Sequence, residues 1–478
     1  MRKILASGRG VAAAAALLVA FTAPAAAGAP VSAPPAAGGP ATGTLADRLA
    51  REVTAASVLP HLTAFQNIAD ANGGNRGYAG PGFTASADYV AGKLTAAGYR
   101  VTRQAVPYTD FAVRRESLSV TDAATGSSRE VRTFMVRRSP QTDAAGLSAP
   151  VVALPEGRTG CSAADYAGLP VAGSVVLMPR DACGWGGQQA AAAAAGARAV
   201  VLWYPTPVPG NIYRLQAMAS LSLPVATVSQ SDGERLARQA RAGATGVRLT
   251  LRGEEVSRTT ENLLAETSGG DPDHVVMAGA HLDSVPEGPG INDNGSTAAA
   301  VLQTALALAP QQSRVREKVR FAFWGAEELV DVGSGYYVSH LSDAAKARIS
   351  VLLNGELIAS PNAGRFVWDS PGGFGHEAAD LLAGYFDRRG LPYQRVTPEN
   401  VGSDHLVFKE AGVAVAGLDG GNLQVKTAEQ AALFGGRAGE MFDSCYHQAC
   451  DRLANLGTGA LDTNSAALAY LVGALAQR

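Results

Sequence analysis

Two histidines and three carboxylates are the residues of this chain best suited to chemistry, because imidazole and carboxylate groups together form a ligand set that suits zinc. In chain order they are His281, Asp293, Glu328, Glu356 and His447. A further carboxylate directly precedes Glu328, at a place where a general base would be useful. The surrounding strings are hard to produce by chance, and they occur in the order GAHLDSV, GINDNGS, WGAEE and CYHQACD. They predict a two-metal hydrolase that cuts peptides.

The first two predicted ligands lie close together in the chain. His281 is expected to bind one metal ion, and Asp283 can accept the other N–H of its imidazole and so fix the tautomer. Taken alone, His281 would more often be an ordinary surface histidine. Asp293 alone would more often be a turn or helix-capping residue, because Asn-Gly-Ser follows it. Beside the other strings, we interpret Asp293 as a carboxylate that bridges two cations.

The glutamates are expected to divide the work. At the end of a strand the side chains of Glu327 and Glu328 diverge, so Glu328 can bind metal while Glu327 stays free. A free carboxylate beside a metal-bound water can take a proton and pass it to the leaving amine. The alternative is a solvated acidic pair. Glu356 lies in the apolar string LNGELIA, where a charge calls for a counter-ion such as a metal, or else a salt bridge or exposure.

The four cysteines fall into two close pairs, Cys161 with Cys183 and Cys445 with Cys450. In an exported protein two disulfides are the natural interpretation, and pairing neighbours is the simplest of the three possible connectivities. Zinc ligation is the alternative, although no C-x-x-C pair is present. A 445–450 disulfide would present its loop rigidly, with His447 as the second imidazole. Tyr446 would either donate its hydroxyl to an oxyanion or simply pack.

The remaining five histidines are not predicted to bind metal. Four of them have no supporting context: His61, His274, His340 and His376. His405, in the string Ser-Asp-His, is expected to support or line the site.

An alternation of strands and helices positions the predicted ligands. Apolar strands are expected at 274–280, 319–324, 349–353 and 413–417, with a helix at 296–308. This alternation predicts an α/β fold with a mostly parallel central sheet flanked by helices. His281, the Glu327–Glu328 pair and Glu356 each follow one of the first three strands. They should therefore meet at the carboxyl edge of the sheet, where ligands bind in such folds.

The texture of the chain suggests an insertion within the catalytic domain. Residues 44–110 are mostly helical in pattern, and 257–478 alternate between strand and helix. Between them, 111–256 contains short β-like runs and no residues at metal-ligand or nucleophile spacing. We expect 44–110 and 257–478 to form one catalytic domain, with 111–256 as a β-rich, non-catalytic insert.

The N-terminus predicts export. Basic residues precede an apolar stretch at 11–21 and small residues at 25–27, which is typical of a signal peptide (1–27) cleaved near Ala27 or Ala29. The apolar stretch is short for a membrane anchor, the alternative. Residues 28–43, rich in Pro, Ala and Gly, suggest a disordered leader. A net charge of −2 argues against nucleic-acid binding. We therefore expect no nucleic-acid partner. From the N-terminus we expect a secreted, extracellular protein without a membrane partner, and we expect it to be a monomer.

At this level of detail the chain resembles the secreted bacterial di-zinc aminopeptidases. These belong to the leucine aminopeptidase-like zinc exopeptidases, which are related to glutamate carboxypeptidase II. The resemblance covers most of the chain from about residue 55. It rests on the segments 279–285, 290–295, 323–328, 403–405 and 445–447. Residues 111–256 resemble a protease-associated domain, on the strings DYAG at 165–168 and CGW at 183–185.

The resemblance implies a role for each site residue. Asp293 would bridge two zinc ions, with a cis peptide bond to Asn294. His447 and Glu328 would complete one zinc site. His281 and Glu356 would complete the other. Glu327 would be the general acid/base, and Tyr446 would polarise the scissile carbonyl or stabilise its oxyanion.

Two residues depart from the family pattern. The family normally has Asp where Glu356 stands, and the extra methylene moves the carboxylate outward. We still expect Glu356 to bind zinc, because Asn354 and the residues 358–362 fit the pattern. Close relatives also often have Arg before Ser-Asp-His. Here Gly402 removes a candidate contact to the substrate backbone or to a product carboxylate.

The predicted function is removal of the N-terminal residue from peptides or proteins. A water shared by two zinc ions would lose its proton to Glu327 and attack the carbonyl. The resemblance suggests a preference for large apolar residues, with Phe374 and 418–423 as candidate pocket walls. The alternatives are a carboxypeptidase or glutaminyl-cyclase-like activity on the same scaffold, and a degenerate, non-catalytic member that lacks a zinc. The sequence leaves a requirement for Ca2+ open.

Overall fold

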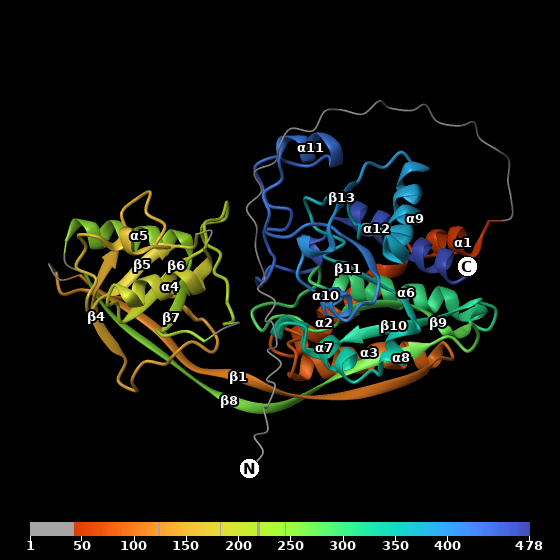
Figure 1. Ribbon diagram of the computed structural model, residues 1–478, viewed down its shortest axis with the longest axis horizontal. Coiled ribbons are helices and arrows are strands. Elements are labelled where there is room, and N and C mark those ends of the chain that lie inside the picture. The colour runs from red at the N-terminus through yellow and green to blue at the C-terminus, as the bar shows by residue number, and fades with distance from the viewer. Residues whose placement is uncertain (1–42, 123–124, 182, 218–219, 244) are drawn as a thin grey trace, which may run out of the picture. The chain divides into compact units, whose positions relative to one another are not determined.

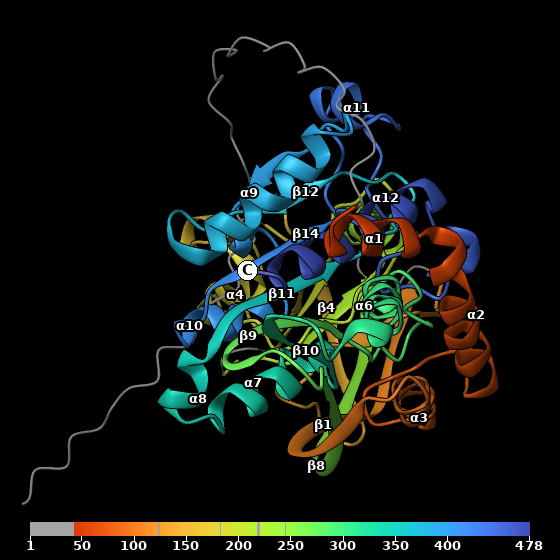
Figure 2. The same cartoon turned by 90° about the vertical axis from the view of Figure 1, so that its right-hand side faces the viewer.

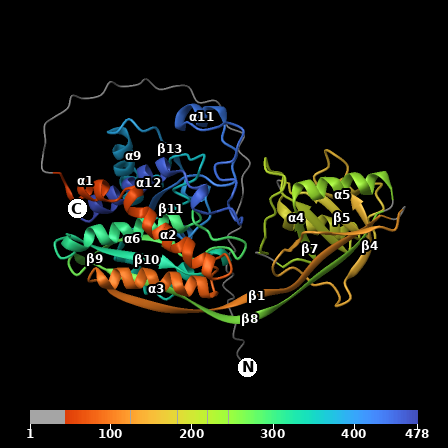
Figure 3. The ribbon, with the colours of Figure 1, turned by 180° about the vertical axis from the view of Figure 1, so that it is seen from behind.

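The computed structural model describes residues 43–122, 125–181, 183–217, 220–243 and 245–478. The predicted signal peptide and all but the last residue of the predicted leader lie outside this part. The described chain forms two compact units: the insert unit, 111–255, and the large unit, 43–110 with 256–478. Two long strands, β1 (Arg100–Asp122) and β8 (Thr245–Glu266), continue from one unit into the other (Figure 1, Figure 3).

The large unit contains a mixed, mostly parallel sheet. Its strand order is β13 (Gln394–Val396), β12 (Phe366–Trp368), β14 (Val415–Asp419), β11 (Ile349–Glu356), β9 (Asp271–His281), β10 (Glu317–Trp324) and the end of β8. The central strands β14, β11, β9 and β10 run parallel, while β12 against β14 and β8 against β10 are antiparallel. The expected parallel sheet is confirmed, and the short strands β12 and β13 are additional.

Helices cover both faces of this sheet. On β9, Val276, Ala278 and Ala280 belong to one hydrophobic core, while Val275 and Met277 belong to another. Successive side chains of a strand point to opposite faces, so each face has its own core. Figure 2 shows α2, α6 and α12 on one side of the sheet and α7 and α10 on the other. The sheet is therefore buried on both sides, as the long apolar strands predict.

The helical segments of the large unit are spread along its whole length. They are α1 (Leu45–Glu52), α2 (Ala55–Ala71), α3 (Pro81–Ala96), α6 (Gly295–Leu308), η2 (Ala309–Gln311), η3 (Glu327–Leu329), α7 (Val332–Ser339), α8 (Asp343–Ala347), α9 (Gly373–Asp387), η4 (Pro398–Asn400), α10 (His405–Glu410), α11 (Ala428–Phe434), η5 (Leu453–Asn455) and α12 (Thr458–Leu475). In the described part of the chain, no helix is both long and apolar enough to cross a membrane.

The insert unit has a smaller parallel sheet of its own. It contains β2 (Ser128–Val131), β3 (Phe134–Met135), β4 (Leu147–Ala153), η1 (Ala163–Tyr166), β5 (Val175–Pro179), α4 (Gly184–Ala194), β6 (Ala199–Trp203), β7 (Val225–Val228) and α5 (Gln230–Ala242). Strands β4 to β7 are parallel neighbours, with β3 antiparallel at the edge. A disulfide joins Cys161 to Cys183, as pairing of neighbours predicted.

Candidate metal centre

Three neighbouring strands bring the predicted ligands to one edge of the sheet. His281 is the last residue of β9, and Glu356 is the last residue of β11. Glu327 and Glu328 open η3 shortly after β10 ends. Because β9, β10 and β11 are parallel, these ends lie at the same edge. The alternation read from the sequence therefore does place these four residues together.

The first ligand group contains His281, Asp293 and Glu356, and all three are buried. Each offers one ligand atom, and these atoms lie within 4.8 Å of one another. The His281 Nε2 atom is 3.5 Å from Asp293 Oδ1 and 3.7 Å from Glu356 Oε2. An imidazole and two carboxylates at this spacing can bind one divalent cation.

The second ligand group contains Asp293, Glu328 and His447, again with ligand atoms within 4.8 Å of one another. His447 Nε2 is 3.1 Å from both Asp293 Oδ2 and Glu328 Oε2. Asp293 thus offers one oxygen to each group, which is the arrangement of a bridging carboxylate. The Asp293–Asn294 peptide bond is cis, as the resemblance implied.

The oxygens of these groups fit a metal pair. Asp293 Oδ2 and Glu328 Oε1 are buried, and neither accepts a well-oriented hydrogen bond from any described residue. Buried carboxylate oxygens without donors are costly unless a cation compensates them. Mixed imidazole and carboxylate donors with shared Asp293 suit two zinc ions.

Two further carboxylates brace the backbone of the ligand segments. Asp283 accepts hydrogen bonds from the backbone N–H of Glu327 at 3.1 Å and of Glu328 at 3.3 Å. Its carboxylate was expected to accept the N–H of His281. Instead the backbone carbonyl of Asp283 is the nearer acceptor, at 3.2 Å from His281 Nδ1, while the carboxylate is 3.8 Å away. Asp451, which the sequence did not single out, accepts the N–H of Asp293 at 3.0 Å.

The two oxygens of Glu356 have different surroundings. Oε1 accepts hydrogen bonds from Asn294 Nδ2 at 2.8 Å and from Ser403 Oγ at 2.5 Å. Oε2 lies on the side of His281. Burial, the largest effect, raises the pKa of Glu356, and the nearby His281 opposes that rise. The longer side chain thus still reaches the first ligand group, with one oxygen fixed by donors and the other turned toward the imidazole.

Glu327 lies beside the first group without belonging to either. Its Oε2 atom is 3.7 Å from His281 Nε2. Burial raises the pKa of Glu327 well above its usual value, with added repulsion from Asp331 and Glu328. A carboxylate with a raised pKa can carry a proton at neutral pH, as a general acid/base must.

The loop that contains His447 is closed by the Cys445–Cys450 disulfide, which confirms the second expected pair. The ring of Tyr446 stacks on that of His447, with centroids 3.8 Å apart. Burial, followed by repulsion from the carboxylates of the site, raises the pKa of Tyr446 well above its usual value. Its hydroxyl therefore stays protonated and can donate a hydrogen bond.

Several other candidates lie outside the two groups. His405 is buried, stacks on Trp368 at 4.1 Å and contacts the Pro398 carbonyl through Nε2 at 2.8 Å. Phe374 packs against the core beneath the Arg478 guanidinium, and Leu418 is fully buried in that core. These two residues are therefore poor walls for a substrate pocket, contrary to the expectation.

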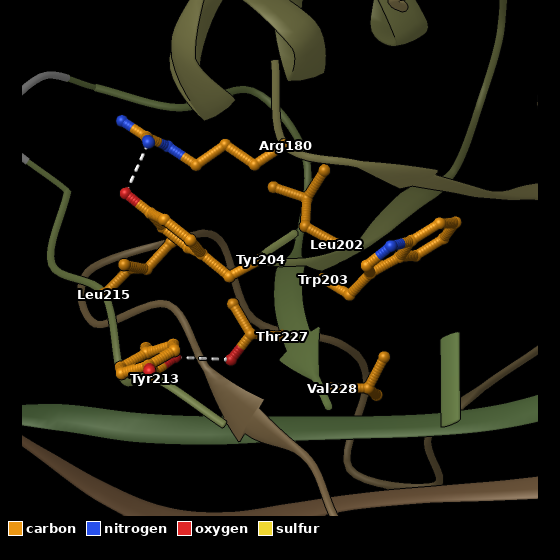
Figure 4. A pocket seen from close by; sticks show the side chains of 8 residues that line it. All are labelled: Arg180, Leu202, Trp203, Tyr204, Tyr213, Leu215, Thr227 and Val228. Carbon is orange, nitrogen blue, oxygen red and sulfur yellow. Dashed lines mark hydrogen bonds between the residues drawn. The ribbon is translucent and has the colours of Figure 1, made fainter. Parts of the chain in front are cut away.

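The insert unit has a small pocket at the carboxyl ends of β5, β6 and β7 (Figure 4). The residues that line it are Arg180, Leu202, Trp203, Tyr204, Tyr213, Leu215, Thr227 and Val228. Arg180 donates a hydrogen bond to the Tyr204 hydroxyl in this pocket. None of these residues is an acid, a histidine or a cysteine, so the pocket offers no metal-ligand set.

Comparison with known proteins agrees with the geometry. Residues 262–472 match the model of Peptidase family M28, and 147–236 match the PA domain. A probable lipoprotein aminopeptidase of Mycobacterium tuberculosis is 38% identical over 92% of this chain and 88% of its own. Leucine aminopeptidase 2 of Trichophyton rubrum is 31% identical over 90% of this chain and 86% of its own. The fold is similar to that of a zinc aminopeptidase from Bacillus subtilis (TM-score 0.69, 21% identity, 89% and 96% coverage).

Proposed function

This chain belongs to peptidase family M28, and from that premise we propose that it removes the N-terminal residue from peptides. The observation that carries the proposal is the pair of ligand groups that share Asp293. Relatives called aminopeptidase or leucine aminopeptidase support an exopeptidase with a preference for large apolar N-terminal residues.

The protein's own residues would hold two zinc ions. His281, Asp293 and Glu356 would bind one ion, and Asp293, Glu328 and His447 would bind the other. When bound, the zinc pair supplies Lewis acidity toward the attacking water and the scissile carbonyl.

Glu327 and Tyr446 would perform the proton and charge chemistry. Glu327 takes a proton from the attacking water and later gives it to the leaving amine, a role that its raised pKa favours. The protonated Tyr446 hydroxyl donates to the oxygen of the tetrahedral intermediate. The carboxylates of Glu327 and Glu356 also provide a negative environment for the free α-ammonium group of a substrate, which favours cleavage at the N-terminal residue.

One rival reaction, that of a carboxypeptidase, lacks support in the contacts of Gly402 and Arg76. A carboxypeptidase would need a basic side chain free to bind a C-terminal carboxylate. Gly402 offers none, and the guanidinium of Arg76, which lies nearby, already donates to three backbone carbonyls. The two disulfides and the basic, apolar N-terminus support secretion of the enzyme.

The test is turnover of leucine p-nitroanilide by the purified full chain, alongside its N-acetylated counterpart and a zinc count. We expect release from the free-amine substrate only, loss of turnover after chelation, and two zinc ions per chain. Turnover of the acetylated substrate, or of a C-terminal residue, would favour a rival reaction. A protein that binds no zinc and stays inactive when zinc is added back would be a degenerate family member.

The assignment of Glu327 has its own test. Glu327→Gln should lower kcat by a factor of about 100 to 10,000 and keep both zinc ions, because the amide cannot carry the proton. Glu328→Gln is the matched control, and it should instead lose zinc. Loss of zinc from Glu327→Gln would make Glu327 a ligand and contradict its role as base.

A further inference from the structure

Arg76 is a fully buried arginine in the turn between α2 and α3, far from the metal-ligand segments in the chain. Its guanidinium donates through Nε to the carbonyl of Pro289 at 2.9 Å and through Nη2 to that of Gly290 at 2.5 Å. Nη1 donates to the carbonyl of Leu282. One side chain therefore binds both ends of the segment 282–290.

The main chain of Arg76 is tied to the same segment. Its N–H donates to Ser284 Oγ at 3.0 Å, and the N–H of Ser284 donates back to the Arg76 carbonyl at 3.3 Å. Ser284 Oγ also donates to the carbonyl of Gly288 at 2.9 Å. The turn at Arg76 and the segment 282–290 thus form one continuous hydrogen-bonded body.

That segment connects His281 to Asp293, the two ligands of the first group. It begins directly after His281 and ends three residues before Asp293. At Gly290, φ is 61°, and a Cβ atom would lie 2.4 Å from the Asp293 carbonyl oxygen and 3.2 Å from Arg76 Nη2. Gly290 is thus packed closely between the Arg76 guanidinium and the Asp293 carbonyl, so we expect a shift of the guanidinium to reach the backbone that carries Asp293.

Arg76 also brings a buried positive charge to an acidic neighbourhood. Burial lowers its pKa to about 10, so the group stays charged at neutral pH, and attraction from Asp283 and Asp451 opposes the lowering. These are the two carboxylates that brace the backbone of Glu327, Glu328 and Asp293. A neutral side chain at 76 would remove this charge and one donor from each of the three buried carbonyls, of which only that of Gly290 has a second donor among the described residues, the N–H of Gly295 at 3.1 Å.

We propose that Arg76 is a positioning residue for the metal pair, which fixes the separation of His281 from Asp293 through the segment 282–290. The proposal rests on the proposed zinc function. It makes the turn between α2 and α3 a support for the metal-ligand segments, although Arg76 lies outside the 262–472 match to the family.

The test compares Arg76→Met and Arg76→Lys with Tyr99→Phe in the full chain. Tyr99 is a matched control, because its buried hydroxyl donates to the Ala305 carbonyl at 2.8 Å in the same unit and far from the ligands in sequence. Zinc affinity is measured by competition with a chromophoric chelator, and amide hydrogen exchange is followed over 282–290 in the zinc-free protein.

We expect Arg76→Met to weaken zinc binding by about ten- to a hundredfold and to speed exchange in the segment. Arg76→Lys should recover part of the affinity, because it keeps the charge and some of the donors. Tyr99→Phe should bind zinc as the wild type does. Wild-type affinity in Arg76→Met, or an equal loss in Tyr99→Phe, would overturn the proposal.

Two further outcomes need their own interpretation: a variant that does not fold, and a wild-type chain that binds no zinc. If Arg76→Met does not fold, Arg76→Lys decides, and wild-type zinc affinity with unchanged exchange in that variant overturns the proposal. If the wild-type chain itself binds no zinc, the proposed function fails rather than the role of Arg76, and exchange over 282–290 then tests whether Arg76 fixes the segment.

Discussion

The carboxylate of Glu356 is held in one orientation by its neighbours, although its side chain is longer than the Asp that the sequence resemblance led us to expect. Its longer side chain would be free to adopt several orientations in the absence of other contacts. Asn294 Nδ2 and Ser403 Oγ both donate to Oε1, and Asn354 Nδ2 in turn contacts Ser403 Oγ at 3.1 Å. This network selects the orientation in which Oε2 lies beside His281, so the extra methylene is accommodated.

Ser403→Ala should therefore weaken zinc binding at the first group. The variant removes a donor that fixes Glu356 but no proposed ligand, so we expect zinc affinity to fall by about ten- to a hundredfold at one of the two sites. Stepwise zinc titration of the full chain measures this. Ser86→Ala is the control, since its buried hydroxyl donates to the Gly82 carbonyl in α3. Equal loss in both variants would contradict a specific role for Ser403.

At the residue scale, the ligand candidates could be predicted and their partners could not. His281, Asp293 and Glu328 lie in short strings whose residue types carry the chemistry. Asp451 closes the string CYHQACD, but neither its role nor that of Arg76 can be inferred from chain neighbours, because both roles depend on contacts with segments 158 and more than 200 residues away. Single-sequence patterns report on neighbours in the chain, and these contacts are made only in the fold.

At the scale of elements, the apolar strands were predictable and the short ones were not. The buried strands β9, β10 and β11 are long enough for an apolar run to be read directly. β12 and β13 have three residues each, which is too short for a periodic signal. The run expected at 413–417 begins two residues early, because the hydrogen-bonded strand β14 is Val415–Asp419.

The disulfide loop 445–450 should control the second ligand group. His447 adopts a left-handed φ of 57°, which is uncommon for a residue other than glycine. Replacing Cys445 and Cys450 with Ser removes the disulfide that constrains the loop in this conformation. We expect the double variant to bind one zinc ion tightly instead of two. The zinc count of the purified protein measures this, with Cys161→Ser/Cys183→Ser in the insert unit as control. Two tightly bound ions in the loop variant would contradict the expectation.

At the scale of the whole molecule, catalysis and the insertion belong to separately packed units. In the insert unit, Val175 and Leu177 face one hydrophobic core while Val176 and Met178 face another. The two ligand groups and their braces all come from the large unit. The insertion interrupts the catalytic sequence between Arg76 and His281 without supplying a ligand, which explains why the sequence of 111–256 shows no catalytic spacing.

In mild acid, His405 should destabilise the large unit, opposing the gain from buried carboxyls such as Asp419, whose pKa burial raises to about 7. Burial lowers the pKa of His405 to about 4 in the folded protein, from 6.5 when exposed. At position 405 the unfolded chain therefore binds a proton more readily between pH 6.5 and 4, and the contribution of His405 to stability is lost as the pH falls through that window. The free energy of unfolding should drop by about 1.4 kcal/mol per pH unit from this group, up to about 3 kcal/mol in total.

His405→Phe, which keeps a ring against Trp368, should remove this part of the slope. Urea unfolding of the chelated protein at several pH values measures it, and Tyr99→Phe controls for a general loss of stability. An unchanged slope in His405→Phe would show that other buried groups govern the acid sensitivity.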